Sequence, residues 1–187
     1  MLDAPSIVVA ACWGVFAITW AIAAFFVKRT LESSWGLGRL LMVAVGFLVY
    51  WIARDPEWFG SARWWGRNLT TEWLAAAVVL LGLFVTLWAR FTLGRNWSGS
   101  VTIKQDHELI ERGPYRWVRH PIYTGLLVMA VGTALLRART SGFVFCGILL
   151  VGLWFKLLAE ERLLTRHFPE AYPQYRQRVR ALIPFVL

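Results

Sequence analysis

Long apolar runs separate the polar segments of this chain and restrict the folds open to it. The first run, Ile7 to Val27, is about 21 residues long, enough for a helix to cross the roughly 30 Å hydrocarbon core of a bilayer. Backbone polar groups in lipid must be satisfied within a helix or a closed barrel. The further runs are Leu37–Ala53, Trp73–Ala89 or as far as Leu93, Ile122–Leu136 and Phe143–Leu158. We therefore predict an all-α fold, a polytopic membrane bundle of five transmembrane helices that forms a single domain, residues 1–187.

Composition argues against a soluble globular domain and against a nucleic-acid partner. Hydrophobic residues make up 58% of the 187, whereas soluble domains average about 45–50%. The net charge of +9 comes from Lys and Arg between the apolar runs, where anionic lipid headgroups explain them better than nucleic acid does. Cys12 and Cys146 lie singly in apolar runs, so we expect neither a disulfide framework nor a metal site. The start, Met1–Pro5, lacks the basic region of a cleaved signal peptide, so we expect the first run to be retained.

Lys and Arg are distributed unequally between the two sides of the predicted membrane. With five spans, fifteen of them fall on the side of the C-terminus and five on the side of the N-terminus. The positive-inside rule then puts the N-terminus outside and the C-terminus in the cytoplasm. We expect an integral protein of a prokaryotic cell (inner) membrane. Spans 1–3 would occupy residues 1–89, and spans 4 and 5 would lie in a second part, residues 90–187.

The segment after the last span is amphipathic. Its apolar side chains recur at helical spacing with arginines between them, and Pro169 and Pro173 are predicted to break the helix. We expect this tail to lie at the cytoplasmic membrane surface and to cover the end of the bundle. The tryptophan-rich segment Glu57–Thr71 is predicted to lie in the opposite interface.

Two prolines constrain the segment Arg112–Gly125, which directly precedes a predicted span. Pro114 fixes its own φ, and Pro121 disfavours the α conformation at His120, so His120-Pro121 is predicted to begin a helix. The unpaired N–H groups of a helix start suit a carboxylate or phosphate. The alternative is that Arg116 and its neighbours are only the positive flank of a membrane helix.

Glu160 and Glu161 directly follow the apolar run of span 5. Carboxylates at the edge of a membrane are costly unless water or a cation reaches them, and their alternative role is to mark the interface. Their natural partners are the arginines and the helix start at Arg116–Pro121, or a cationic ligand. Donors for a carboxylate on one element and acceptors for a cation on another suit a zwitterion such as S-adenosylmethionine.

Several motifs in the second half of the chain closely resemble the isoprenylcysteine carboxyl methyltransferase family. They are Arg119-His-Pro-Ile-Tyr-Thr-Gly125, Glu160-Glu161-Arg-Leu-Leu, Phe168-Pro-Glu-Ala-Tyr-Pro-Gln-Tyr175 and Leu93-Gly-Arg-Asn-Trp-Ser98. The resemblance covers roughly Arg90 to Pro184. It implies an integral membrane enzyme that uses S-adenosylmethionine, with a cofactor-binding region in residues 90–187 and a pocket closed by the region after the last span.

The resemblance also implies roles for individual residues. Glu108, Leu109 and Ile110 would lie along the adenosine. The methionine end would be held by Tyr115 and by the turn Val118, Arg119, His120 and Pro121, with Tyr123 lining the pocket. Glu160 and Glu161 would hold the ammonium and ribose side. The candidate catalytic residues are Arg90 and Arg119, which would orient the acceptor carboxylate, and Glu160; Asn96-Trp97 are further candidates for contact with the acceptor.

The identity of the acceptor stays open at this stage. We expect a lipid-like or prenylated molecule with a carboxylate, reached from the membrane lipids, with isoprenylcysteine as the example that the resemblance implies. A phospholipid amine acceptor would first have to lose a proton, and one of the two glutamates would become a general base. Sterol-reductase-like enzymes, which use NADPH, resemble the family in the same half of the chain. A non-catalytic membrane partner or transport subunit is the alternative from another class.

Overall fold

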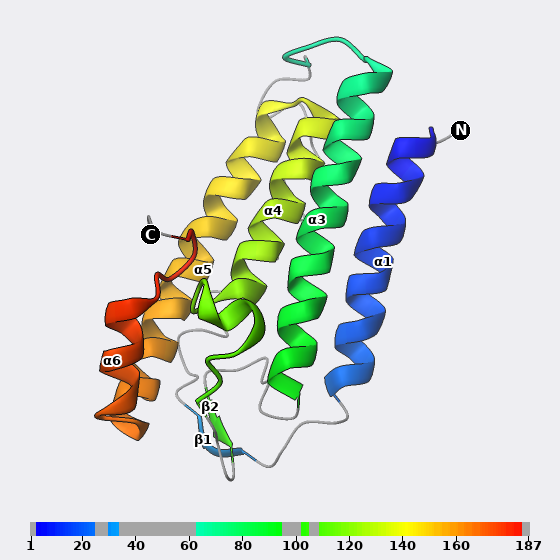
Figure 1. The fold of residues 1–187 in the computed structure, drawn as a ribbon. Coiled ribbons are helices and arrows are strands. Elements are labelled where there is room, and N and C mark those ends of the chain that lie inside the picture. Colours follow the sequence, from blue (N-terminus) through cyan, green and yellow to red (C-terminus); the bar gives the residue numbers. More distant parts are fainter. Residues whose placement is uncertain (1–2, 25–29, 34–62, 95–101, 105–108, 185–187) are drawn as a thin grey trace.

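The structure is a computed structural model that describes residues 3–24, 30–33, 63–94, 102–104 and 109–184. Its main body is a set of long helices standing side by side, with shorter elements gathered at one end (Figure 1). The elements are α1 (Ala4–Ala24), β1 (Thr30–Ser33), α3 (Leu69–Leu93), β2 (Thr102–Lys104), the 3-10 helix η3 (Gly113–Arg116), α4 (Pro121–Arg137), α5 (Thr140–His167) and α6 (Ala171–Arg178).

The long helices α1 and α3 run in the same direction, α4 runs back, and α5 returns (Figure 1). The helix α3 packs against both α1 and α4, and the interior between these three helices is apolar. Its fully or almost fully buried members include Val9, Cys12, Ala76, Val79, Leu83 and Met129. A second apolar cluster lies where α4 and α5 meet the C-terminal segment, and it includes Leu153, Leu157 and Leu182.

Small residues allow α3 and α4 to approach unusually closely. A Cβ atom on Gly82 would lie 2.7 Å from the carbonyl oxygen of Gly125, and one on Gly132 would lie 2.9 Å from the carbonyl oxygen of Ala75. Beside Gly125, Thr86 is fully buried and donates its hydroxyl to the carbonyl of Gly82 at 2.7 Å. Close backbone approach over small residues is the usual way in which membrane helices gain packing energy.

The α4–α5 connection is tighter than the sequence predicted. The apolar runs Ile122–Leu136 and Phe143–Leu158 leave six residues between them, but the two helices are joined by Ala138 and Arg139 alone. Ala138 adopts a left-handed conformation, φ 52° and ψ 35°, and its N–H bonds the carbonyl of Ala134 at 2.8 Å, which closes the end of α4. Trp64 covers this turn by stacking on Phe143 with ring centroids 5.0 Å apart.

The helix α3 begins at Leu69, four residues before the predicted start. Asn68 is its N-cap, and the side-chain oxygen accepts a hydrogen bond from the N–H of Thr70 at 2.9 Å. Arg67 then bonds the buried carboxylate of Glu72 and also pairs with Asp3 in front of α1. This ion triad joins the beginnings of α1 and α3.

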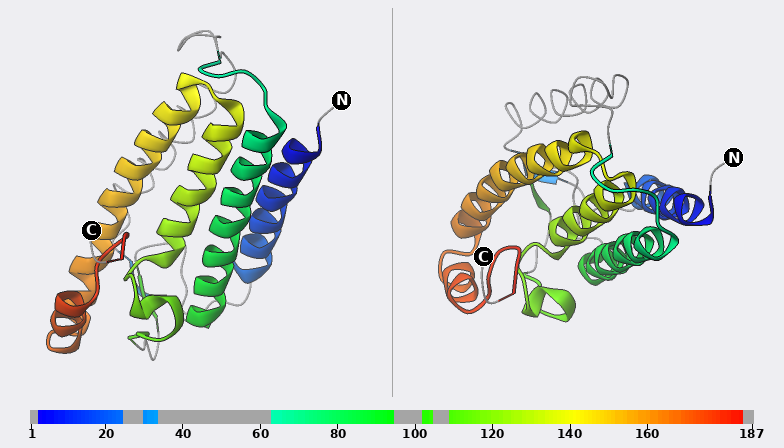
Figure 2. Two further views of the ribbon diagram at one scale, coloured as in Figure 1. Left: turned by 45° about the horizontal axis from the view of Figure 1, so that its top comes forward. Right: turned by 90° about the horizontal axis from the view of Figure 1, so that it is seen from above.

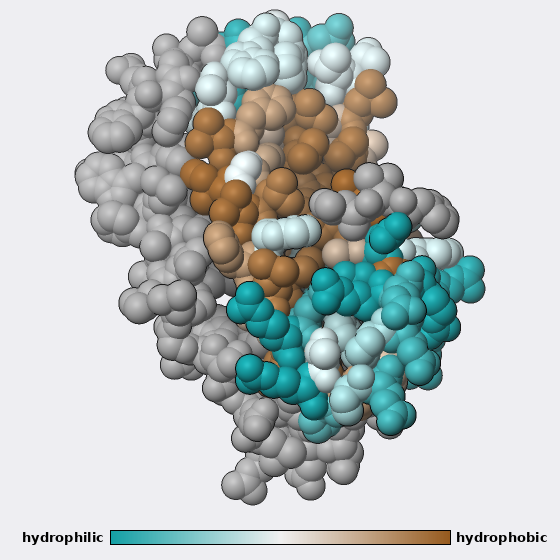
Figure 3. Space-filling model, turned by 90° about the vertical axis from the view of Figure 1, so that its left-hand side faces the viewer, coloured by the Kyte–Doolittle hydropathy of each residue, from teal (hydrophilic) through white to brown (hydrophobic). Residues whose placement is uncertain are grey.

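Three described helices, α1, α3 and α5, are long and apolar enough to cross a membrane, and α4, with 17 residues, is a shorter apolar helix. The predicted span Leu37–Ala53 lies outside the described residues. The helix surfaces carry large exposed apolar side chains, among them Ile18, Leu81, Phe84 and Phe155. On the face in Figure 3, brown hydrophobic side chains form a band over the helices, and hydrophilic side chains gather below it. These features support an integral membrane protein.

The structure corrects three details of the predicted fold. The described part of the chain is mainly helical, but β1 and β2 form a two-stranded antiparallel sheet that an all-α prediction does not include. The helix α5 continues to His167, nine residues past the predicted end of span 5, so both glutamates lie on a helix. Pro169 does separate α5 from α6. Pro173, however, lies in the first turn of α6, where its missing N–H has no helical acceptor to lose.

The contact between α3 and α4 predicts the effect of enlarging one of its glycines. Gly125→Ala places a methyl group against Thr86 and the backbone of Gly82, so we expect a loss of about 1–3 kcal/mol, as for other overpacked sites. Gly147→Ala is the matched control, since a Cβ there meets nothing within 4 Å. Melting temperatures of the two variants in detergent give the comparison. Equal melting temperatures would show that the close approach does not exist.

Candidate functional site

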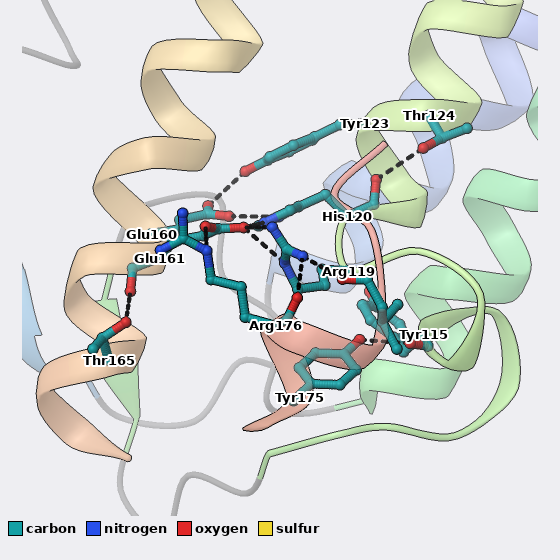
Figure 4. A network of polar contacts seen from close by, with 11 residues as sticks. Tyr115, Arg119, His120, Tyr123, Thr124, Glu160, Glu161, Thr165, Tyr175 and Arg176 are labelled. Carbon is teal, nitrogen blue, oxygen red and sulfur yellow. Dashed lines mark hydrogen bonds and ion pairs between the residues drawn. The ribbon is translucent and has the colours of Figure 1, made fainter. Parts of the chain in front are cut away.

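Three separate parts of the chain meet at the lower end of the bundle. They are the turn that leads into α4, the last turns of α5, and the C-terminal segment formed by α6 and residues 179–184. Seen along the helices, α6 lies beside the end of α5, and the C-terminal segment lies beside the start of α4 (Figure 2, right view). Their polar side chains form one network (Figure 4).

The ion pair between Arg119 and Glu161 is the centre of this network. Arg119 donates to Glu161 Oε1 from Nε at 2.8 Å and from Nη2 at 2.6 Å. The two side chains are only 8% and 5% exposed. The remaining nitrogen, Nη1, donates to the carbonyl oxygens of Arg176 and Val179 in the C-terminal segment. Arg119 therefore binds α5 and the C-terminal segment at the same time.

The second carboxylate, Glu160, faces the start of α4. Tyr123 donates its hydroxyl to Glu160 Oε1 at 2.5 Å, and His120 Nδ1 lies 3.6 Å from Glu160 Oε2. The other ring nitrogen of His120, Nε2, lies 3.3 Å from Glu161 Oε1. The imidazole thus stands between two carboxylates, and its ring stacks on that of Tyr123 with centroids 5.4 Å apart.

Backbone hydrogen bonds fasten the C-terminal segment to the start of α4. The N–H groups of Arg119 and His120 donate to the carbonyls of Arg180 and Ala181, at 2.8 and 3.0 Å. Thr124, one turn into α4, donates its hydroxyl to the carbonyl of Leu182 at 2.7 Å. Pro121 disfavours the helical conformation at His120, whose φ is −125° and ψ is 59°. The N–H groups of Arg119 and His120 are therefore outside the helix and can bond the C-terminal segment.

Tyrosines connect α6 to η3. The hydroxyl of the buried Tyr175 donates to the carbonyl of Tyr115 at 2.5 Å. Burial raises the pKa of Tyr115 well above its ordinary value, with a further increase from the negative charge of Glu160. Burial raises the pKa of Tyr175 as well, so both phenols stay protonated at neutral pH and act as hydroxyl groups.

The electrostatics of His120 differ from those of an isolated buried imidazole. Burial lowers its pKa, but hydrogen bonds to Glu160 and Glu161 and the negative charge of both carboxylates outweigh burial, so that the pKa is raised above the ordinary value. The imidazolium is therefore favoured in the folded protein. It adds positive charge to that of Arg119 beside the two glutamates.

Most of the residues expected at the site come together. Val118 and Pro121 are buried beside His120, and Tyr115, Tyr123 and Ile110 belong to the apolar cluster beneath it; Leu109 is half-buried next to Ile110. Glu108 and Asn96-Trp97 lie outside the described residues.

The hydrogen bonds that the structure gives Arg90 lead to the ends of two helices. Arg90 is buried on α3 and donates to the carbonyls of Gly94, at 2.7 Å, and of Ala23, at 3.3 Å, so it ties the end of α3 to the end of α1.

Three contributing residues were not anticipated from the sequence. Arg176 on α6 lies 3.4 Å from Glu161 Oε2, and Thr165 donates to the carbonyl of Glu161. Lys156, one turn before Glu160 on α5, places its ammonium 5.3 Å from the centre of the Tyr123 ring. The i, i+4 spacing of Lys156 and Glu160 could have indicated that Lys156 lies on the same face of α5 as Glu160.

Comparison with protein families identifies the region that holds this site. Residues 74–166 match the model of the isoprenylcysteine carboxyl methyltransferase family. The match covers nearly half of the 187 residues. The matched region contains the Arg119–Glu161 pair, His120, Tyr123 and Glu160, whereas α6 and the segment that follows it lie beyond the match.

Individual relatives carry names that agree with the family. The chain is 30% identical over 158 residues to protein-S-isoprenylcysteine O-methyltransferase of Saccharomyces cerevisiae, covering 80% of this chain and 65% of the yeast protein. It is 30% identical over 169 residues to the protein of the same name from Rattus norvegicus, covering 85% and 57% of the two chains. The chain thus spans about three fifths of the length of the curated relatives it matches.

A solved structure shares the fold. The eukaryotic intramembrane Ras methyltransferase, an isoprenylcysteine carboxyl methyltransferase, superposes with a TM-score of 0.55 at 22% identity, covering 83% of this chain and 55% of the other. This likeness supports the arrangement of the membrane helices.

The position of His120 between two carboxylates predicts a pH-dependent stability. Because its pKa is raised in the folded state, its stabilisation is complete below the ordinary histidine pKa of about 6.5 and is lost as pH rises through the folded-state pKa. The melting temperature in detergent should therefore fall as pH increases above about 6.5. In His120→Gln this fall should be reduced. His167→Gln is the control for removing one imidazole. If the melting temperature of His120→Gln fell with pH as that of the wild type does, His120 would not be the group responsible.

Proposed function

We propose that this chain is an integral membrane methyltransferase that transfers a methyl group from S-adenosylmethionine to the carboxylate of a lipid-linked acceptor, with isoprenylcysteine as the model acceptor. The observation that carries the proposal is the buried network of Arg119, His120, Glu160 and Glu161 inside the region that matches the family. The names of the relatives support the same activity.

The residues present fit the charges of S-adenosylmethionine. This molecule carries an α-carboxylate, an ammonium and a sulfonium, and when bound it supplies an electrophilic methyl group. Glu160 and Glu161 would hold the ammonium and ribose side. His120 and the start of α4 would bind the carboxylate, since the imidazolium form of His120 is favoured. Leu109 and Ile110, with Glu108, would lie along the adenosine, and Tyr115 and Tyr123 would form walls of the pocket.

The roles of the chain in the reaction are orientation and exclusion of water. A carboxylate acceptor is already ionised at neutral pH and needs no general base. It has to be held in line with the sulfonium in a site from which water is excluded. The apolar cluster of Tyr115, Tyr123, Leu153 and Leu157 would exclude water on the bilayer side of the network. The C-terminal segment would do so on the other side.

Three cationic side chains, Arg119, Arg90 and Lys156, are the candidates for orienting the acceptor. Arg119 already donates to Glu161 and to two carbonyls, and Arg90 donates to the carbonyls of Gly94 and Ala23. Lys156 stands beside Tyr123 and Glu160 at the inner end of α5, and we include it among the groups that would meet the acceptor carboxylate. Glu160 would become a general base only for an amine acceptor.

The membrane arrangement that goes with this function has five spans, an outer N-terminus and the network at the cytoplasmic end. The strand β1 lies at the same end of the bundle as the network, whereas α3 begins at the opposite end (Figure 1). This placement supports the number of crossings, as does the excess of Lys and Arg on the C-terminal side. A prokaryotic cell membrane stays our prediction.

Binding of the cofactor tests the site directly. We expect the purified protein in detergent to bind S-adenosylmethionine but not NADPH in isothermal titration. Glu160→Gln keeps the shape of the side chain and removes its charge, so the affinity should fall about tenfold to a hundredfold, the equivalent of one charge-assisted hydrogen bond. Glu170→Gln, an exposed glutamate at the start of α6, should bind as the wild type does. Unchanged affinity in Glu160→Gln would refute the assignment.

The pH dependence of the rate distinguishes a carboxylate from an amine acceptor. With a prenylated cysteine, the acceptor contributes no change in rate from about pH 6 to 8, because its carboxylate ionises well below this range. An amine acceptor reacts in its neutral form, so its rate should rise with pH. Labelled cofactor offered with a prenylated cysteine and, in parallel, with phosphatidylethanolamine gives the comparison. Methyl incorporation into the amine lipid alone would replace the proposed acceptor.

A further inference from the structure

A row of aromatic rings leads from the exposed surface of α3 to the turn before α4. Phe84 and Trp88, one turn apart on α3, have ring centroids 5.9 Å apart, and Trp88 meets Trp117 edge-to-face at 5.4 Å. Phe84 is 60% exposed and Trp117 is 44% exposed. The rings therefore form one accessible aromatic surface at the end of α3 that lies near the network.

Two exposed arginines, Arg112 and Arg116, lie near these rings. The guanidinium of Arg116 lies 4.7 Å from the centre of the Trp117 ring, and Arg112 stands one turn earlier in the chain. Both arginines are exposed, and neither pairs with a carboxylate within the part of the chain that the structure describes. The indole N–H groups of Trp88 and Trp117 likewise make no hydrogen bond to any described residue. The surface thus offers cations and N–H donors together.

We propose that this surface binds the headgroup of an anionic phospholipid in the cytoplasmic leaflet. Tryptophan rings prefer the boundary between acyl chains and headgroups, and arginine donates two hydrogen bonds to a phosphate. The apolar side of the surface is continuous with the exposed Phe84 and Leu81 of α3, on which acyl chains would lie. A soluble anion would use the arginines but would gain nothing from this apolar surface.

The proposed lipid site adjoins the network through η3. Gly113 has φ +61°, and a Cβ atom there would lie 2.9 Å from Thr92 Oγ1, so η3 rests directly on α3. Tyr115 in η3 accepts the hydrogen bond from Tyr175, and Arg119 follows three residues after Arg116. A headgroup held by Arg112 and Arg116 would therefore stabilise the turn that presents Arg119 and His120. Binding of the lipid does not depend on the proposed methyl transfer.

Thermal stabilisation by added lipid tests the proposal without an activity assay. The purified protein in non-ionic detergent is titrated with phosphatidylglycerol, phosphatidylcholine or inorganic phosphate, and the melting temperature is followed. We expect phosphatidylglycerol to raise the melting temperature at lower concentration than phosphatidylcholine does, and phosphate to have no effect. In Arg112→Gln/Arg116→Gln the half-saturating phosphatidylglycerol concentration should rise by about fivefold for each arginine removed. Trp117→Ala should raise it with the charges intact.

Arg162→Gln/Arg166→Gln is the matched control, because it removes the same charge from two exposed positions at the end of α5. We expect it to respond to phosphatidylglycerol as the wild type does. An equal loss in the control pair would show general attraction to anionic lipid and overturn the site. Equal responses of the wild type to phosphatidylglycerol and phosphatidylcholine would overturn it as well. Melting temperatures without lipid show whether each variant is folded.

Discussion

The ion pair between Arg119 and Glu161 connects three parts of the chain that are far apart in sequence. A buried ion pair is not by itself evidence of stability, because the free-energy cost of removing two charges from water offsets much of their attraction. Breaking one by deleting a partner is different, and costs about 3–5 kcal/mol because the other charge is left buried. The pair therefore serves mainly to specify which surfaces meet. With Arg119 bonded to Glu161 and to the carbonyls of residues 176 and 179, α5 and the C-terminal segment can join the start of α4 in one register.

The membrane explains why such a pair is placed at the end of the bundle. Deep in the hydrocarbon region the helices are held mainly by van der Waals contacts, which the glycine contact between α3 and α4 supplies. A hydrogen bond from the indole N–H of Trp13 on α1 to the hydroxyl of Thr133 on α4, at 3.1 Å, adds to them. At the end of the bundle that holds the network, the proposed site needs charged groups for a zwitterion, and the same groups hold the chain segments together. Arg119 would thus give the site its shape, while Glu160, Glu161, His120 and Tyr123 would face the ligand.

Much of this arrangement could be predicted from the sequence, because it follows from local rules. The apolar runs give α1, α3, α4 and α5, and the His120-Pro121 dipeptide gives the start of α4. The pairing of Glu161 with one particular arginine could not be predicted, since Arg112, Arg116 and Arg119 are equivalent by composition. The antiparallel pairing of β1 with β2 could not be predicted either, because the two strands lie far apart in the sequence and no local pattern indicates that they pair. The hydrogen bonds of Arg90 to the ends of α1 and α3 could not be predicted either, because they depend on the rotation of α3, which no pattern of apolar residues fixes finely enough.

Hydrogen exchange at the start of α4 tests most directly whether the Arg119–Glu161 pair holds the C-terminal segment in place. The N–H groups of Arg119 and His120 are protected by the carbonyls of Arg180 and Ala181. In Glu161→Gln their exchange should become faster, because Arg119 loses the carboxylate that holds it on the C-terminal segment. Glu111→Gln removes only the exposed pair with Arg178 and should leave their protection unchanged. Equal exchange in the wild type and Glu161→Gln would contradict the account.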